Sequence, residues 1–418
     1  VMPSKLNLPG GLRMLLHADA GFMAMQKLKR QFEMHFGTEI EVRALSIDRL
    51  HQEILDNAAR AQSRYDLVTC DVCWMEEMIH ADAIRPVQMP DGGEARDLMD
   101  FHPEALSTVQ RDDVLYGIPV QTTPELFLYR TDIFEQNGLK PPRRLSEVMD
   151  CARRLHGSAR GLYGICWNGA RGTPVGTSFI MLMADFGQPI LNLPRLGNGF
   201  RDQRLAGEEL VPMLDSGQAQ EAAEFLVELL AWSPPNVLQM SWFERARCYA
   251  DGRAAMAYCY TQILPMIENQ PDSPGYGRTG YLPHPTAPGI PRSAPLGGWN
   301  ICIPANLKPA RIDDVTKAAR TLTSAAATKL YIENGSLVSS RFSVCNDPVV
   351  AHGRPVISNV DQMARSGQLQ TWARPAVPQF NTLVRILGEE IHTMLLRNKK
   401  PAAALRDAQA RCERAMGL

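Results

Sequence analysis

Long apolar runs and an excess of basic charge are both absent from this sequence. No segment of the 418 residues reaches the ~18 consecutive apolar positions that a membrane-spanning helix needs, so we expect no membrane insertion. The 44 basic and 45 acidic residues give a net charge of −1, whereas nucleic-acid-binding proteins carry a basic excess or a basic face. The short basic run Arg397–Lys400 is typical of a solvated helix end, so we expect no nucleic-acid partner.

The motifs of the common catalytic and phosphate-binding sites are also missing. The sequence contains no G-x-S-x-G, H-E-x-x-H, P-loop or G-x-G-x-x-G pattern, and nothing in it selects two carboxylates for glycoside hydrolysis. We therefore predict that the protein is not an enzyme and needs no cofactor. An enzyme on the same scaffold stays open as a third hypothesis, because a fold does not fix a function.

A second cysteine pair is absent, which bears on the motif Cys70-x-x-Cys73. A structural zinc site needs four ligands, and the nearest histidines, His51 and His80, add no recognisable metal pattern. The motif follows a strand-like run, as a thioredoxin-like redox pair would, but the rest of that pattern is missing. We predict that both cysteines pack in the core or in a cleft wall, with redox chemistry as the alternative. We predict no metal site there and no stoichiometric zinc in the purified protein.

The compartment is ambiguous from the sequence. Nine cysteines and the lack of an apolar signal segment in VMPSKLNLPGG favour a reducing, cytoplasmic location. Buried thiols resist oxidation, however, and four of the cysteines sit in apolar or strand-like surroundings: Cys151, Cys166, Cys259 and Cys302.

Strand and helix patterns alternate through the first part of the chain. Strand-like runs at residues 12–16, 39–45 and 65–70 are separated by apolar stripes of helical spacing, which predicts a parallel sheet with helices on both faces. Further strand patterns occur at 125–129, 161–167, 254–260 and 296–305. The Pro- and Gly-rich residues 271–298 predict an irregular connection, and helical patterns dominate from residue 313 onward.

Six segments, in this order, resemble a known family. They are YDLVTCDVCW with HADAIRPV, VLYGIPVQTTPELFLYRTDIFEQNGLKPP, ADGRAAMAYCY, LGGWNICIP, GSLVSSRFSVCNDP and PAAALRDAQARCERAM. The family is extracellular solute-binding protein family 1, the maltose-binding-protein-like receptors of ABC importers. The sequence departs from the family pattern at Arg144-Leu145, where Thr-Trp is usual, and at Ser340-Arg341, where Pro-Arg is usual. Cys70 and Cys73 also replace ordinary small residues.

The resemblance implies an α/β fold, the two-lobed type II periplasmic-binding-protein-like fold, with discontinuous domains and a ligand cleft between the lobes that closes by a hinge motion. We expect one lobe from residues 1–124 and 280–335, and the other from 125–279 and 336–418. The implied function is capture of a small polar ligand, a sugar or a polyol, for the permease subunits of an ABC transporter in the periplasm. We expect a monomer. The alternative is a cytoplasmic ligand-sensing domain of a regulator with the same fold.

Candidate ligand-binding residues follow from strand ends, because ligands of open α/β sheets sit outside the carboxyl ends of the strands. The loops there are His17–Gly21, Asp71–Trp74, Gln121–Glu125, Trp167–Thr173, Tyr258–Gln262 and Gly297–Asn300. The candidates are Asp19, Asp71, Trp74, Glu125, Trp167, Trp242, Tyr260, Trp299, Asn300 and Arg374.

Each candidate also has a purely structural interpretation. Asp71 can cap a helix and Trp74 can belong to the core. Gly297-Gly298 would let the backbone approach a ligand and Trp299 would offer a flat face to a sugar ring, or Trp299 is a core residue at a strand start. We predict that Trp299 stacks on the ligand.

Overall fold

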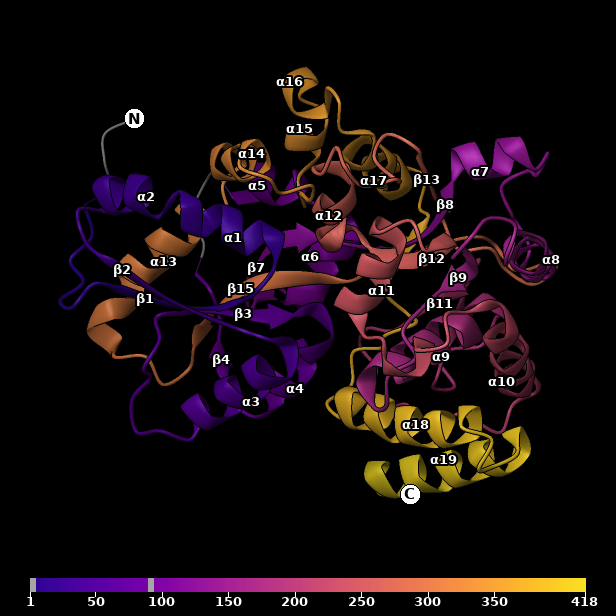
Figure 1. Cartoon of the computed structure of the whole chain (residues 1–418). Coiled ribbons are helices and arrows are strands. Elements are labelled where there is room, and N and C mark those ends of the chain that lie inside the picture. Colours follow the sequence, from indigo (N-terminus) through magenta and orange to yellow (C-terminus); the bar gives the residue numbers. More distant parts are fainter. Residues whose placement is uncertain (1–4, 89–93) are drawn as a thin grey trace. The chain divides into compact units, whose positions relative to one another are not determined.

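A computed structural model describes residues 5–88 and 94–418 of the chain (Figure 1). The described residues form two α/β units, and each unit combines two separate stretches of chain. The first unit comprises the described residues up to Thr123 together with Leu296–Ser366. The second comprises Pro124–Pro295 and Gly367–Leu418.

The division between the units differs from the predicted lobes in two segments. The first crossing, between Thr123 and Pro124, lies one residue from the predicted one. Residues 280–295 group with the second unit because β13 (Thr279–Leu282) pairs there with β8 (Glu125–Arg130). Residues 336–366 group with the first unit, where a β-bridge joins Phe101 to Arg341. Main-chain pairing, which the local sequence pattern does not report, decides both assignments.

The first unit alternates strands and helices as the sequence pattern predicts. Its strands are β1 (Leu12–His17), β2 (Ile40–Leu45), β3 (Leu67–Asp71), β4 (Ile84–Arg85), β5 (Gln110–Arg111), β6 (Val114–Leu115), β7 (Ile118–Thr122) and β15 (Gly298–Pro304). Its α-helices are α1 (Ala20–Lys27), α2 (Lys29–Phe36), α3 (Ile47–Ala58), α4 (Met75–His80), α5 (Glu94–Met99), α6 (Pro103–Val109), α13 (Ile312–Leu322), α14 (Ala325–Glu333), α15 (Phe342–Cys345), α16 (Pro348–Ala351) and α17 (Pro355–Arg365). Short 3-10 turns are η1 (Val72–Trp74) and η5 (Pro309–Arg311).

The sheet of the first unit is mixed and is completed by a strand from the second stretch of chain. Its order is β2-β1-β3-β15-β4, and β7 also pairs with β15. Strands β1, β2 and β3 are parallel, whereas β15 runs antiparallel to β3 and to β7 (Figure 1). The register places Trp299 opposite Asp71 on one side and Gln121 on the other. The carboxyl ends of β1, β3 and β7 therefore meet the beginning of β15 at a single edge of the sheet.

A buried carboxylate ties the two stretches of the first unit together. Asp66 accepts hydrogen bonds from Arg311 Nε at 2.7 Å and from Arg13 Nε at 3.1 Å, and its side chain is fully buried. Burial alone would raise the pKa of Asp66, but the hydrogen bonds from Arg311 and Arg13 outweigh it and hold that pKa below its usual value. The carboxylate therefore stays ionised and paired at neutral pH.

The second unit has a smaller sheet and longer helices. Its strands are β8, β9 (Tyr163–Cys166), β10 (Arg195–Leu196), β11 (Gly199–Phe200), β12 (Ala254–Tyr260), β13, β14 (Ala294–Pro295) and β16 (Leu369–Gln370). Its α-helices are α7 (Thr131–Gln136), α8 (Leu145–Leu155), α9 (Thr173–Asp185), α10 (Gly217–Leu229), α11 (Trp242–Ala250), α12 (Pro265–Glu268), α18 (Phe380–Leu395) and α19 (Pro401–Met416). Short 3-10 turns are η2 (Leu230–Trp232), η3 (Val237–Gln239) and η4 (Thr261–Ile263).

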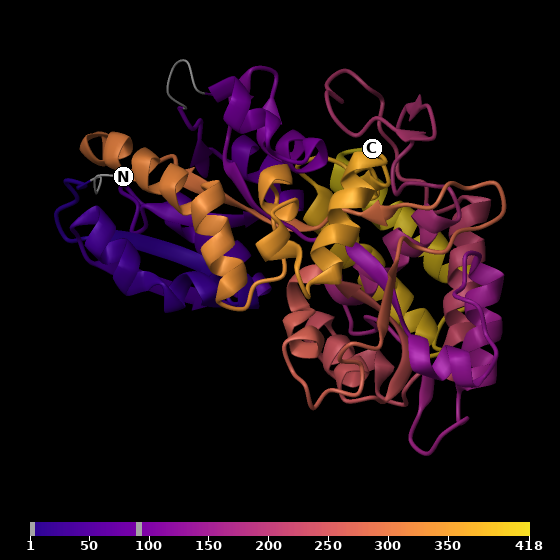
Figure 2. The same cartoon turned by 90° about the horizontal axis from the view of Figure 1, so that it is seen from above.

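The sheet of the second unit has the order β13-β8-β12-β9. Strand β8 runs antiparallel to both β12 and β13, and β12 is parallel to β9. Helix α9, whose residues are nearly all buried, packs against α18, and α18 lies beside α19 at the yellow end of the chain (Figure 2). The prediction that residues 271–298 are irregular was wrong at β13 and β14, because β13 pairs with β8 and β14 pairs with β16.

The beginning of α8 explains one departure from the family pattern. Arg144 occupies the N-cap position, where a threonine hydroxyl is usual. Glu147 compensates, because its Oε2 accepts the main-chain N–H groups of Arg143 at 2.6 Å and of Arg144 at 3.0 Å. The helix therefore keeps a capped first turn without the hydroxyl.

Candidate functional site

An aromatic cluster lies at the carboxyl edge of the sheet in the first unit. The indole of Trp299 stacks on the imidazole of His17, with ring centroids 4.2 Å apart and ring planes 14° apart. Trp74 meets the same indole edge-on at 5.4 Å, and Phe22 does so at 6.4 Å. Only 1% of Trp299 is exposed, so much of its ring surface is already covered by protein groups.

The close approach of β7 and β15 explains the glycine before Trp299. Gly298 has φ +152°, and a Cβ on it would lie 2.2 Å from the carbonyl oxygen of Gln121. Any side chain at this position would separate the two strands. The glycine therefore serves the strand pairing that carries Trp299.

The two aspartates at this edge both cap helical turns. Asp19 Oδ1 accepts the N–H of Phe22 at 3.0 Å and an amide N–H of Gln121 at 3.1 Å, while Oδ2 lies 2.8 Å from His17 Nδ1. Asp71 accepts the N–H of Cys73 at 3.1 Å. The capping interpretation thus describes the contacts of both carboxylates, and each still lies at the edge where the strands end.

Asn300 points into the interior of the first unit. Its side-chain amide donates to the hydroxyl of Thr108 at 3.1 Å, and 1% of the residue is exposed. The strand register shifts between Trp299 and Asn300, which changes how the two side chains are presented. Cys70 and Cys73 are both buried, in keeping with the predicted packing role.

The second unit gathers polar residues at the corresponding edge of its own sheet. Glu125 begins β8 and pairs in register with Tyr260, the last residue of β12. Trp167 follows β9, and His284 follows β13 two residues after Leu282, which pairs with Phe127. The register therefore brings residues from four separate segments to one edge of the sheet.

A buried ionic network connects these residues. Arg245 Nη2 lies 2.7 Å from Glu125 Oε2, and both side chains are almost completely buried. His284 Nδ1 lies 2.9 Å from Asp185 Oδ2, and its Nε2 lies 3.5 Å from Glu125 Oε1. Two cationic groups and two carboxylates are thus held together in a region of low polarity.

Burial and ion pairing act against each other on the pKa values of Asp185 and His284. Burial raises the pKa of Asp185 to about 6, opposed by the charge of His284 and its hydrogen bond. Burial would lower the pKa of His284, but the charge and hydrogen bond of Asp185 outweigh it, so that pKa is raised. The pairing therefore favours the ionised form of each group, and burial opposes it.

Several buried polar atoms around the network have no hydrogen-bond partner among the residues that the structure describes. They include the amide oxygen and the amide nitrogen of the Asn168 side chain, all three guanidinium nitrogens of Arg245, the hydroxyl of Tyr258 and Nε2 of His284. Arg245 still forms a close ion pair with Glu125, with 2.7 Å between Nη2 and Oε2. Unpartnered buried groups are rare in proteins, so this set has the character of a site that receives a polar ligand.

A small cavity adjoins the network. Its volume is about 20 Å³, enough for a water-sized group, and it is lined in part by Glu125, Trp167, Asp185 and Tyr258. The hydroxyl of Tyr258 shares this space with two carboxylates, and burial raises the pKa of that hydroxyl well above its usual value. Tyr258 therefore stays a neutral hydrogen-bond donor and acceptor there.

The remaining predicted residues of the second unit are less closely connected to the network. Trp167 is buried, and its indole N–H donates to the hydroxyl of Ser233 at 2.9 Å. The ring of Tyr260 lies 5.5 Å from the guanidinium carbon of Arg245. Trp242 begins α11 and is partly exposed, and Arg374 follows β16 in a turn.

Sequence reasoning missed several members of the network. Asn168 and Tyr258 lay within loops selected from the sequence, but neither was chosen as a candidate. Asp185 carried a usable signal, since it is a single charged residue at the end of the apolar helix α9. Arg245 and His284 had no local signal, because only the folded sheet brings α11 and the Pro-rich segment to Glu125.

No helix in the described ranges 5–88 and 94–418 is both long and apolar enough to cross a membrane. This agrees with the lack of long apolar runs in the sequence.

Sequence comparison identifies the family of this chain. A profile of the bacterial extracellular solute-binding proteins matches residues 27–353. The chain belongs to this family. The resemblance drawn from the six sequence segments is therefore confirmed, and the chain is a solute-binding protein.

Individual relatives resemble the chain over most of its length. The mannitol-binding protein of Pseudomonas aeruginosa is 24% identical over 328 residues, which are 78% of this chain and 70% of that protein. The structure of an ABC transporter solute-binding protein from Agrobacterium radiobacter K84 in complex with ribitol has a TM-score of 0.86 and 22% identity, covering 96% of this chain and 98% of that one. One from Agrobacterium vitis S4 with bound D-mannitol has a TM-score of 0.82 and 19% identity, covering 97% and 98% of the two chains.

These likenesses establish the fold. TM-scores above 0.8 across nearly the whole of both chains confirm the predicted type II solute-binding fold. At such low identity the neighbours do not fix the ligand of this chain, which has to be argued from its own residues.

Proposed function

We propose that this chain captures a polyol or a monosaccharide and delivers it to the permease subunits of an ABC importer. The observation that carries the proposal is the set of buried polar atoms on Asn168, Arg245, Tyr258 and His284 that make no hydrogen bond to the described residues. A hydroxyl group can both donate and accept a hydrogen bond. A ligand rich in hydroxyl groups would therefore satisfy the buried donors and the buried acceptors of this site together. The printed ligands of related proteins, mannitol and ribitol, belong to this chemical class.

The same residues argue against a charged ligand. Arg245 and His284 already face Glu125 and Asp185, so the network is close to neutral when all four groups are ionised. An anion or a cation would disturb this balance in a buried place, whereas a neutral polyol would not. The proposed receptor binds its ligand without altering it chemically, so it is not an enzyme. It works as a monomer in the periplasm.

Binding assays with defined ligands test the proposal. The full chain is first unfolded and refolded to remove any ligand carried through purification. It is then titrated by calorimetry with ribitol, D-mannitol, D-tagatose and maltose, and with L-glutamate as a charged control. We expect binding of at least one polyol or monosaccharide and none of glutamate. Tight binding of the charged control, with no binding of any neutral carbohydrate or polyol, would contradict the proposal.

A pair of tyrosine variants tests the site itself. Tyr258→Phe removes one hydroxyl and keeps the ring that packs edge-on against Phe127 and His284. We expect this variant to bind the ligand about tenfold more weakly, since a lost hydrogen bond is worth ~1–1.5 kcal/mol. Tyr276→Phe, at an exposed position of the same unit, is the matched control and should bind like the parent protein. Equal affinity of the parent protein, Tyr258→Phe and Tyr276→Phe would show that the hydroxyl of Tyr258 does not bind the ligand.

A further inference from the structure

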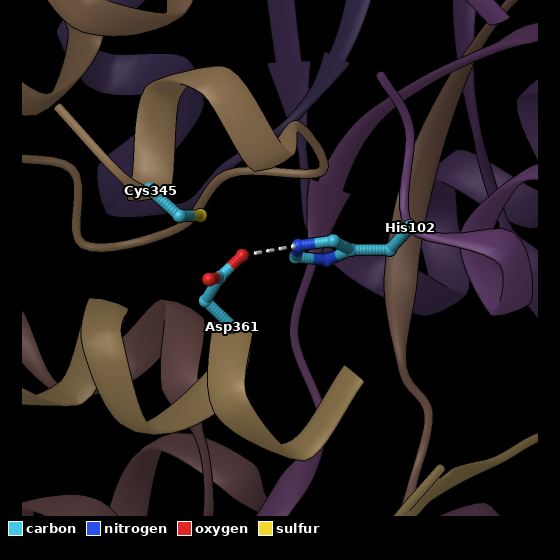
Figure 3. Close-up of side chains that lie close together, drawn as sticks. All are labelled: His102, Cys345 and Asp361. Carbon is cyan, nitrogen blue, oxygen red and sulfur yellow. Dashed lines mark hydrogen bonds and ion pairs between the residues drawn. The ribbon is translucent and has the colours of Figure 1, made fainter. Parts of the chain in front are cut away.

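Three potential metal ligands meet inside the first unit, away from the strand edge described above. They are His102 at the N-cap of α6, Cys345 at the end of α15 and Asp361 in α17. One ligand atom from each lies within 4.8 Å of the other two (Figure 3). We propose that His102, Cys345 and Asp361 form a binding site for a divalent transition-metal ion, with zinc as the ion that the ligand set fits best. This proposal replaces the expectation from the sequence that the purified protein contains no stoichiometric zinc.

The geometry is close to what zinc requires. His102 Nε2 lies 3.2 Å from Asp361 Oδ1, and the three side chains project toward a common point (Figure 3). A tetrahedral zinc ion with bonds of ~2.0–2.3 Å holds its ligand atoms roughly 3–4 Å apart. The nitrogen and the oxygen already meet this spacing, and the sulfur needs only a small shift. A water molecule would complete the four ligands.

The backbone holds the three ligands in place before any ion binds. The N–H of His102 donates to the carbonyl of Ser340 at 2.8 Å, and the N–H of Phe342 donates to the carbonyl of Asp100, also at 2.8 Å. The ring of Phe342 also packs edge-on against His102, with centroids 4.7 Å apart. Segments that are distant in sequence are thus fastened together on either side of the cluster.

The contacts that an ion would displace are few. The side chain of His102 makes a single hydrogen bond to any described residue, the one to Asp361, and its Nδ1 is buried without a partner. Asp361 uses its other oxygen, Oδ2, to accept from Arg365 Nε at 2.8 Å. The carboxylate can therefore bind a metal through Oδ1 while Arg365 orients it through Oδ2, which is a common arrangement around metal ligands.

The charge around the cluster favours a cation. The charged side chains that influence its groups are Asp100, Glu104, Asp361 and Arg365. Three carboxyl groups against one guanidinium group leave a formal excess of negative charge. A dication bound to a thiolate adds one positive charge and reduces this excess.

The cluster suits a metal better than it suits a nucleophile. His102 is 0% and Cys345 4% exposed, which leaves no room for a substrate. A metal ion, by contrast, displaces the thiol proton on binding and needs little space. Because the ligands are buried, the ion would enter during folding and exchange slowly afterward.

Metal content after refolding tests the proposal. The full chain is unfolded in denaturant that contains a chelator and is then refolded with Zn²⁺ or with Co²⁺. Gel filtration removes the unbound ions. We expect about one ion per chain by elemental analysis, and a sulfur-to-cobalt charge-transfer band in the Co²⁺ form. Folding is checked by circular dichroism. Correctly refolded protein that holds less than about a tenth of an ion per chain would overturn the proposal.

Variants separate this site from other thiols. Cys345→Ser keeps the side-chain shape and should lose the charge-transfer band and most of the metal, and Asp361→Asn should lose most of the metal. Cys73→Ser is the matched control, since it removes a buried thiol of the same unit outside the cluster. It should retain the metal. Metal that persists in folded Cys345→Ser and Asp361→Asn, or disappears in Cys73→Ser, would assign the ion to another place.

Discussion

The imidazole of His17 lies face to face with the indole of Trp299, with their centroids 4.2 Å apart. The two residues lie at the same edge of one sheet, on β1 and β15 with β3 between them, and they come from the two different stretches of the first unit. The stack means that one face of Trp299 is already occupied. A ligand that contacts this indole must use its other surfaces or displace the imidazole.

Replacing Trp299 tests its two possible roles. Trp299→Phe keeps an aromatic ring against His17 but loses the indole N–H and part of the buried surface. We expect the free energy of unfolding to fall by ~1–3 kcal/mol, and the free energy of ligand binding to weaken by more than ~1 kcal/mol. Urea unfolding and calorimetry measure the two quantities. Trp232→Phe, in a short 3-10 turn of the second unit, is the control. Unchanged affinity in a folded variant would assign Trp299 to the core.

Glu125 is predicted to stabilise the second unit through its charge. Glu125→Gln keeps the shape of the side chain but leaves Arg245 without its anionic partner in a buried place. We expect the free energy of unfolding to fall by ~3–5 kcal/mol at pH 7, as when one member of a buried pair is removed. Glu228→Gln breaks an exposed pair with Arg153 and should change it by less than ~1 kcal/mol. Similar effects of the two changes in urea unfolding would show that the buried charge is unimportant.

Asp66 is predicted to make the first unit sensitive to acid. Its pKa in the folded protein lies below the ordinary value of 3.8, so its ionised form stabilises the fold above pH 3.8. That stability is lost as the pH falls through the lowered pKa. We expect Asp66→Asn to lower the free energy of unfolding by about 3 kcal/mol at pH 7, and the difference from the parent protein to shrink below pH 4.

Urea unfolding between pH 7 and pH 3 measures this difference. Asp56→Asn on the exposed side of α3 serves as the control and should change stability little at any pH. A difference between Asp66→Asn and the parent protein that stays constant over the whole pH range would contradict the assigned role of the carboxylate.

The cysteines are predicted to be chemically silent in the folded protein. All nine are buried. We expect a thiol reagent to label fewer than about one thiol per chain under native conditions and close to all nine in denaturant. Ready labelling of many thiols in the native protein would favour the cytoplasmic sensor, because exposed thiols are oxidised in an oxidising compartment.

The sequence predicted the fold well because the fold depends on patterns that are local. Apolar spacing located β1, β3, β8 and β12, and the order of short motifs identified the family. It also placed Glu125 and Trp167 at strand ends, where the structure has them. The sequence did not predict the pairing of distant segments. Because of this pairing, residues 280–295 belong to the second unit and residues 336–366 to the first, the reverse of what was expected.

The candidate site was predicted less completely than the fold for the same reason. Arg245 and His284 can be recognised as site residues only from their contacts with Glu125. These contacts depend on strand register rather than on spacing along the chain. The cluster of His102, Cys345 and Asp361 is another case, since each residue is unremarkable in its own segment. The importance of such residues lies in their partners, which a single sequence does not show.

The antiparallel strand β15 also has a consequence for the time course of folding. It supplies the pairing partner of β3, β4 and β7, all of which precede it by far in the chain. During synthesis, the sheet of the first unit must wait with an unpaired edge until residue 304 has left the ribosome. The second unit waits longer, because α18 and α19 come last and cover α9 and α10. Contacts between residues so far apart make folding slow, and both units are therefore expected to reach their native state only at the end of synthesis.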